Sequence, residues 1–135
     1  MKFFVSLVVL VLVGQAARVN AQTPAPGAVI AWEKNIHDFG DIAQGDKVEH
    51  SFKFTNTGSD PLVITNVQVT CGCTTPKGWP RDPINPGDKV EITVQFNSSG
   101  KIGRQNKVVT VVSNAVGGNN QITFSANVLE KKAHN

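Results

Sequence analysis

The chain has 135 residues, two cysteines, no tyrosine and a formal net charge of +3. This length allows a single domain. The charge forms no basic stripe of the kind that binds nucleic acid, so no nucleic-acid partner is expected.

The first 21 residues have the pattern of a secretory signal peptide. Lys2 is followed by an apolar run from Phe3 to Val13, and small residues surround Ala21. This run is shorter than the ~20 residues that cross a bilayer. We therefore expect residues 1–21 to be removed on export, which leaves no transmembrane segment and a periplasmic or extracellular protein. Their removal lowers the net charge to +1, because Lys2 and Arg18 are lost.

The remaining chain divides into three parts. Residues 22–28 are rich in proline and small residues, which is typical of a flexible leader. Residues 29–130 form the expected domain, and residues 131–135 a charged tail. The exported part holds 13 Val and 8 Ile but only two Leu, a composition that favours strands over a helical bundle or an enzyme of alternating strands and helices.

Short segments of alternating apolar and polar residues, separated by turn signals, predict the strands. In chain order they are 29–32, 37–42, 47–56, 62–69, 89–96, 108–112 and 122–128. The phase of alternation changes near Thr65 and Asn66, which indicates a bulge or a switch of the strand between sheets. Segment 108–112 is apolar on both faces and fits a central strand. About seven short strands with frequent turns predict an all-β antiparallel sandwich.

Three segments together carry a resemblance to a known family. They are His37-Asp38-Phe39-Gly40-Asp41-Ile42 with Gly45, Phe52-Lys53-Phe54-Thr55-Asn56-Thr57-Gly58 with Pro61-Leu62, and Cys71-Gly72-Cys73-Thr74-Thr75-Pro76 with Pro86-Gly87. The chain, over roughly residues 29–129, resembles an exported bacterial family, frequent in the Bacteroidetes, known as domain of unknown function number fifteen-seventy-three. That family is similar to immunoglobulin-like sandwiches of the pilus-chaperone, major-sperm-protein and hydin type. The resemblance implies this fold and export, but no reaction and no catalytic residues.

Cys71 and Cys73, separated by Gly72, are the pair with the clearest chemical potential. Residues two apart in a strand lie about 6.6 Å apart, whereas the Cβ atoms of a disulfide lie about 3.8 Å apart. We expect Gly72 to adopt a positive φ that brings the thiols together. So small a bridge is easily reduced and suits redox exchange. Lys77 and Arg81 nearby would favour the thiolate.

Two other interpretations of the pair stay open. Both cysteines are small, apolar residues that can pack at a sheet edge, with Gly72 at a bulge. Two thiolates also bind soft metals, and His37 and His50 are candidates for the remaining ligands. The lack of methionine after the signal peptide disfavours a copper carrier.

Residues around the cysteines form a candidate binding loop. Its members are Gly72, Thr74, Lys77, Trp79 and Arg81. An aromatic among glycine and proline, as Trp79 is, either contacts a partner or folds back to cap the end of the sandwich.

No constellation of catalytic residues is evident. His37 lies beside Asp38 but has no nucleophile of fixed geometry, and no Gly-x-Ser-x-Gly motif occurs. We expect no enzyme, no cofactor and no small-molecule substrate. The leading hypothesis is an exported module with a binding or structural role in the envelope, which contacts a protein through a sheet edge or the 71–81 loop. The alternative is a thiol-redox or soft-metal protein that uses Cys71 and Cys73.

Overall fold

The computed structural model describes residues 25–118 and 120–131. The predicted signal peptide, residues 22–24 of the leader and residues 132–135 of the tail lie outside this part of the chain. The described residues form eight strands. They are β1 (Ile30–Trp32), β2 (Ile36–Ala43), β3 (Lys47–Asn56), β4 (Ile64–Val69), β5 (Thr74–Gly78), β6 (Lys89–Asn97), β7 (Gly103–Ser113) and β8 (Asn120–Leu129). None of these residues belongs to a helix that could cross a membrane.

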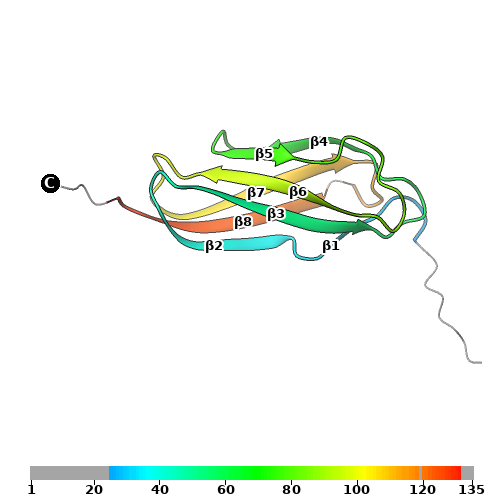
Figure 1. The fold of residues 1–135 in the computed structure, drawn as a ribbon, viewed down its shortest axis with the longest axis horizontal. Helices are drawn as coiled ribbons and strands as arrows, with labels where there is room; N and C mark the ends of the chain where they lie inside the picture. The colour runs from blue at the N-terminus through cyan, green and yellow to red at the C-terminus, as the bar shows by residue number, and fades with distance from the viewer. Residues whose placement is uncertain (1–24, 119, 132–135) are drawn as a thin grey trace, which may run out of the picture.

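The strands form two four-stranded sheets that pack face to face (Figure 1). One sheet has the order β1-β3-β6-β5 and the other β2-β8-β7-β4. All neighbours are antiparallel except β2 and β8, which run parallel. This is the strand order of an immunoglobulin domain whose first strand is split into β1 and β2, one half in each sheet. The predicted all-β, immunoglobulin-like sandwich is therefore confirmed.

Strand β5 was not among the expected strands, since the sequence places its residues in a loop. It lies at the edge of its sheet, where Thr74 is in register with Phe96 and Pro76 with Val94. Proline cannot donate a ladder hydrogen bond, but an edge strand tolerates it because one side of the strand has no neighbour. Pro76 and Gly78 hide the strand from a search for alternating apolar residues. The 71–81 segment is consequently a turn, a strand and a second loop.

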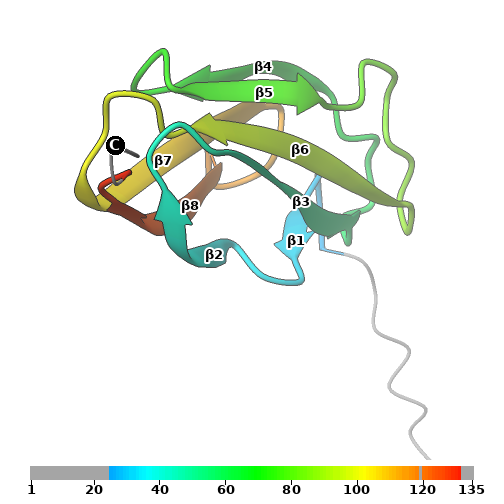
Figure 2. The same cartoon turned by 60° about the vertical axis from the view of Figure 1, so that its left-hand side comes forward.

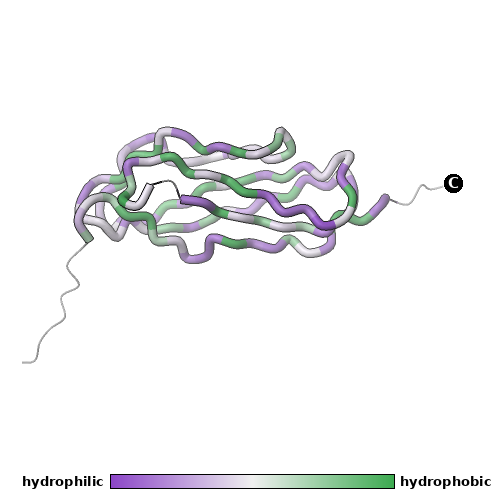
Figure 3. The backbone as a smooth tube through the Cα atoms, turned by 180° about the vertical axis from the view of Figure 1, so that it is seen from behind, coloured by the Kyte–Doolittle hydropathy of each residue, from purple (hydrophilic) through white to green (hydrophobic). Residues whose placement is uncertain are grey.

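The core lies between the inner faces of the two sheets. Four phenylalanines fill it and are at most 2% exposed; they are Phe52, Phe54, Phe96 and Phe124. Apolar and polar segments alternate along the strands, as the backbone in Figure 3 shows. The expected central strand is β7, in which Val109 and Val111 are fully buried. Of the two irregularities expected near Asn66, the structure has the bulge, as a register shift between Ile64 and Asn66, and β4 stays paired with β7 on both sides of it.

The last residues of the expected leader, 25–28, contact the domain. Ala28 is 2% exposed, and the backbone N–H of Ser59 donates to the carbonyl of Gly27 at 2.8 Å. Gly58 permits this approach, because a Cβ at that position would lie 2.8 Å from the nitrogen of Val29. Composition does not show these contacts, since it carries no information on which backbone segments fit closely together.

Asn56, at the end of β3, joins several segments through a fully buried side chain. Its carbonyl oxygen accepts hydrogen bonds from the backbone N–H groups of Gly58 at 3.0 Å and Val29 at 3.2 Å. Its amide nitrogen donates to the carbonyls of Asp60 at 2.8 Å and Ile84 at 2.9 Å. Every hydrogen-bonding position of the side chain is thus used, as burial of an amide requires.

Candidate functional site

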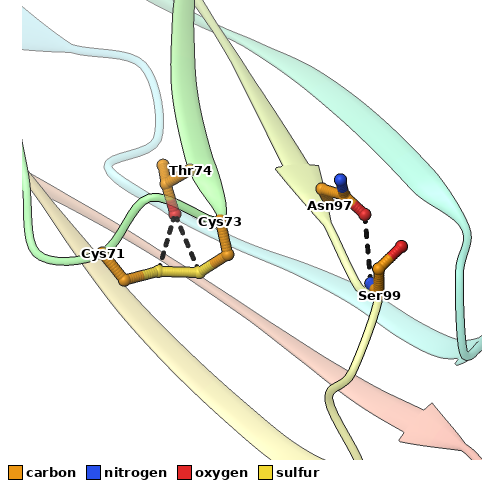
Figure 4. Close-up of a disulfide and its surroundings, with 5 residues drawn as sticks. All are labelled: Cys71, Cys73, Thr74, Asn97 and Ser99. Atoms are coloured by element: carbon orange, nitrogen blue, oxygen red, sulfur yellow. Dashed lines mark hydrogen bonds between the residues drawn. A yellow bond between two sulfur atoms is a disulfide. The ribbon is translucent and has the colours of Figure 1, made fainter.

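The two cysteines form a disulfide where the chain crosses from one sheet to the other. Cys71 and Cys73 lie in the connection between β4 and β5, and their Cα atoms are 5.3 Å apart (Figure 4). Two backbone hydrogen bonds also hold this connection: Thr74 donates to the carbonyl of Cys71 at 3.3 Å, and Asn97 donates to that of Cys73 at 2.8 Å. The structure therefore has the pair in its oxidised form.

The backbone of Gly72 does not have the positive φ that was expected. Gly72 is not among the glycines with positive φ, and no other residue of the described chain has a positive φ except glycine. Gly72 and Cys73 instead occupy the centre of a β-turn whose φ angles suit most residues. The turn itself shortens the distance between the cysteines. A Cβ placed on Gly72 would meet no atom within 4 Å, so the outer side of the turn is open.

Thr74 has the most direct contact with the sulfur atoms. Its side-chain oxygen lies 3.9 Å from the sulfur of Cys71 and 3.9 Å from that of Cys73, as the dashed lines in Figure 4 show. The residue is only 4% exposed. A buried hydroxyl therefore faces both sulfurs. The sequence places Thr74 in the candidate binding loop but does not reveal its position beside the sulfurs.

The two cations expected to act on the thiols are engaged elsewhere. The Nζ atom of Lys77 lies 3.4 Å from a carboxylate oxygen of Glu49, and the guanidinium carbon of Arg81 lies 3.6 Å from the centre of the Trp79 ring. Trp79 is half-buried and packs against the core. The two cations thus have partners of their own, and the structure offers no support for a role in stabilising a thiolate.

The histidines form a pair that joins the two sheets. The rings of His37 on β2 and His50 on β3 are stacked, with centroids 3.6 Å apart and planes at 8°. Phe39 and Phe52 contact the pair edge-on, at 4.6 Å from His37 and 4.8 Å from His50. Burial lowers the pKa of His50 below its ordinary value, and the neighbouring His37 lowers the pKa further.

This arrangement does not bring the histidines to the cysteines. His50 is in register with Val94, which is in register with Pro76 on β5. Two strand spacings, about 10 Å, separate β3 from β5. Within residues 25–118 and 120–131, no group of three or more His, Cys, Asp or Glu is placed to hold a metal ion. The combined cysteine and histidine ligand set considered from the sequence is therefore not assembled.

A second candidate site is the free edge of β3. The N–H of Glu33 donates to the carbonyl of Lys53 at 3.0 Å, so odd-numbered residues of β3 direct their backbone groups away from β6. Strand β1 pairs only with the end of β3, over Phe54 to Asn56. Lys47, Glu49 and Ser51 therefore direct their backbone N–H and C=O groups to an edge with no neighbouring strand among the described residues.

The other sheet edges are short, as β1 is with three residues, or carry features that hinder strand addition. Strand β5 contains Pro76, and β4 has a register shift next to Asn66. Strand β2 has a register shift around Gly40, whose φ is +74°. The part of β7 beyond β4 contains Lys107, which shares the core-facing side with Phe124. Proline, bulges and inward-pointing charges are the devices by which edges avoid pairing with other chains. The free part of β3 pairs with β6 without any register shift.

A shallow groove runs beside the free edge of β3. It is lined by Glu33 and Lys34 from the connection between β1 and β2, and by residues 50–53 of β3. The same edge lies on the side of the sandwich where β1 and β2 meet, opposite β4 and β5 (Figure 2). An extended chain laid in this groove would meet both the free backbone groups and charges of each sign.

The model of a family described as "Protein of unknown function (DUF1573)" matches residues 30–128. The chain belongs to the DUF1573 family. This match confirms the resemblance that the three sequence segments indicate. A search of curated proteins finds no significant match.

Solved structures show where else the fold of this DUF1573 chain occurs. A protein of unknown function from Porphyromonas gingivalis W83 is 19% identical, with a TM-score of 0.63, and the match covers 82% of this chain and 51% of that one. The ASH/PapD-like domain 7 of human CEP192 is 12% identical, with a TM-score of 0.60 and coverage of 84% and 94%. The secreted serine protease VesC from Vibrio cholerae is 13% identical, with a TM-score of 0.61 and coverage of 78% and 24%.

These structures establish the fold and nothing more. The chain spans about half the length of the Porphyromonas protein and about a quarter of the Vibrio protease. At such identities, the chemistry of a longer protein does not transfer to a shared sandwich domain.

Proposed function

We propose that this DUF1573 chain is an exported, non-enzymatic module of a bacterial cell envelope, which binds an extended segment of another protein along the free edge of β3. The segment would add a strand beside β3 and extend the sheet. In this mode of recognition, backbone hydrogen bonds supply affinity and the side chains that line the groove supply specificity.

The observation that carries this proposal is the row of unpartnered backbone groups on β3. Lys47, Glu49 and Ser51 direct their N–H and C=O groups to the same edge, as the bond from Glu33 to Lys53 establishes for the strand. Such an edge is a template for another strand, and exposed templates are usually blocked unless they have a use. The register of β3 with β6 has no shift, so no bulge interrupts this template.

Two features support export. The apolar start of the sequence has the length and flanks of a signal peptide. The bond between Cys71 and Cys73 fits an oxidising compartment, since disulfides persist outside the cytosol. Fractionation of the source cells, with detection of the protein outside the cytoplasm, tests this part of the proposal directly.

The edge is tested with two substitutions at one position. Glu49→Pro removes the N–H that faces the edge, whereas Glu49→Gln removes only the charge and the ion pair with Lys77. Immobilised wild-type protein and both variants are incubated with envelope extract, and circular dichroism checks that all three are folded. We expect wild type and Glu49→Gln to retain the same protein and Glu49→Pro to lose it.

Hydrogen exchange locates the contact. The retained protein should protect the backbone amides of Glu49 and Ser51, while amides of β5 exchange as before. Equal retention by Glu49→Pro, protection confined to another edge, or no retained protein at all would each overturn the proposal.

A further inference from the structure

We propose that the Cys71–Cys73 disulfide is an electron acceptor for a dithiol in a partner protein. The site is independent of the β3 edge, because it lies at the start of β5, the strand at the opposite edge of the same sheet. The chemistry is thiol–disulfide exchange, in which a thiolate attacks one sulfur and displaces the other.

The disulfide contributes little to holding the fold together. Its two cysteines flank one residue, and the same turn is already closed by the backbone hydrogen bond from Thr74 to Cys71. Strand β5 is held to β6 by its own ladder. The disulfide therefore connects no elements that would otherwise separate. Its reduction leaves the strands on both sides with their backbone partners.

The turn that carries the bond is accessible to an incoming thiolate, since Cys71 and Cys73 are only half-buried. Gly72 is exposed and has no atom within 4 Å of the position where a Cβ would be. The two sulfurs are not equivalent, since Cys73 packs against the hydrophobic core. Attack is consequently directed to the sulfur of Cys71, and the sulfur of Cys73 is the leaving group.

Thr74 is placed to stabilise the leaving thiolate. Its hydroxyl lies 3.9 Å from each sulfur, and the residue is buried. A neutral disulfide sulfur is a weak acceptor, whereas a thiolate is a charged one, and hydrogen bonds to charged groups are the stronger kind. The contact therefore strengthens as the sulfur–sulfur bond breaks, which favours departure of the Cys73 sulfur.

The complete exchange has two steps. A partner thiolate attacks the Cys71 sulfur to form a mixed disulfide, and the electron pair of the broken bond leaves on the Cys73 sulfur, which then takes a proton from solvent. The second partner thiolate attacks the partner's own sulfur in the mixed disulfide and releases Cys71 as a thiolate, which is protonated in turn. The partner dithiol loses two electrons and becomes a disulfide, while Cys71 and Cys73 gain them as thiols.

Dithiothreitol is the probe dithiol for the test. Protein purified without reductant is titrated for free thiols and then reduced under pseudo-first-order conditions. Four forms are compared: wild type, Thr74→Val, Thr74→Ser and Thr75→Val. We expect no free thiols before reduction and two afterwards. Thr74→Val should be reduced roughly threefold to tenfold more slowly, Thr74→Ser at a rate close to wild type, and Thr75→Val, whose side chain is exposed, at the wild-type rate.

A second measurement identifies the attacked sulfur. In Cys73→Ser the remaining Cys71 should form a mixed disulfide with oxidised glutathione several times faster than Cys73 does in Cys71→Ser, as mass spectrometry of the adducts would show. Two free thiols in protein purified without reductant would overturn the proposal. So would a disulfide that resists dithiothreitol in the folded protein, equal rates in Thr74→Val and Thr75→Val, or faster modification of Cys73.

Discussion

The substitution Asn56→Ala is expected to destabilise the domain more than any surface change. The side chain is fully buried and makes four hydrogen bonds, which join the start of β1, the turn after β3 and the segment at Ile84. Its loss leaves two N–H and two C=O groups without this partner. At about 1 kcal/mol for each bond, the free energy of unfolding falls by about 4 kcal/mol. That is a large share of the 5–15 kcal/mol, roughly, that stabilises a small domain.

Urea unfolding followed by tryptophan fluorescence measures this loss, because Trp32 and Trp79 both pack against the core. The matched control is Asn106→Ala, an exposed position on β7, which should change the free energy of unfolding by no more than about 0.5 kcal/mol. The melting temperature of Asn56→Ala should fall by about 15–20 °C. A loss within 1 kcal/mol, roughly, of the control would show that water or a shifted backbone replaces the amide, and would refute the reasoning.

Three further outcomes are expected. Gly58→Ala should lower the free energy of unfolding by about 3 kcal/mol, because the added Cβ would meet backbone atoms. Gly72→Ala, which has open space around it, should leave the free energy of unfolding unchanged or raise it by about 0.5 kcal/mol. Equal losses for the two variants in urea unfolding would contradict the close approach at Gly58. Replacing Cys71 and Cys73 together by serine should lower the free energy of unfolding by less than about 2 kcal/mol, since a loop this small restricts the unfolded chain little. A larger loss in the same assay would mean that the disulfide has a structural role. The pKa of His50 is lowered in the folded state, so the unfolded chain binds more protons as the pH falls below about 6.5, and stability declines from there through the lowered folded-state pKa. His50→Phe should lose less stability than wild type between pH 7.5 and 5, and parallel losses in the two proteins would exclude this histidine as the cause.

The candidate sites were only partly predictable. The spacing of Cys71 and Cys73 alone shows that any bond between them closes a very small ring, and that identifies the pair as the most testable chemical feature. The role of Thr74 is different, because its contact with both sulfurs depends on the turn that places it inside the sandwich. Similarly, the histidines stack only because the first strand is split between the sheets, which places His37 on β2 against His50 on β3 of the opposite sheet.

The free edge of β3 illustrates the limit of sequence patterns most directly. Alternation of apolar and polar residues indicates that 47–56 is a strand with one buried face. It carries no information about the strand's lateral neighbours, since backbone groups are alike in every residue and their partners lie far away in the chain. Because β1 ends at Trp32, the edge of β3 that faces away from β6 has no partner strand from Lys47 to Ser51 in the described part of the chain.

By itself, then, the sequence determined the all-β class, the single sandwich, most strand positions and the presence of an irregularity near Asn66, because side-chain periodicity and turn residues act locally. The tertiary structure decided which edges are open, that β5 exists despite Pro76, and that Asn56 and Gly58 contact the segment before β1. These features depend on backbone hydrogen bonds and close contacts between segments distant in sequence, and the periodicity of a single segment does not encode them.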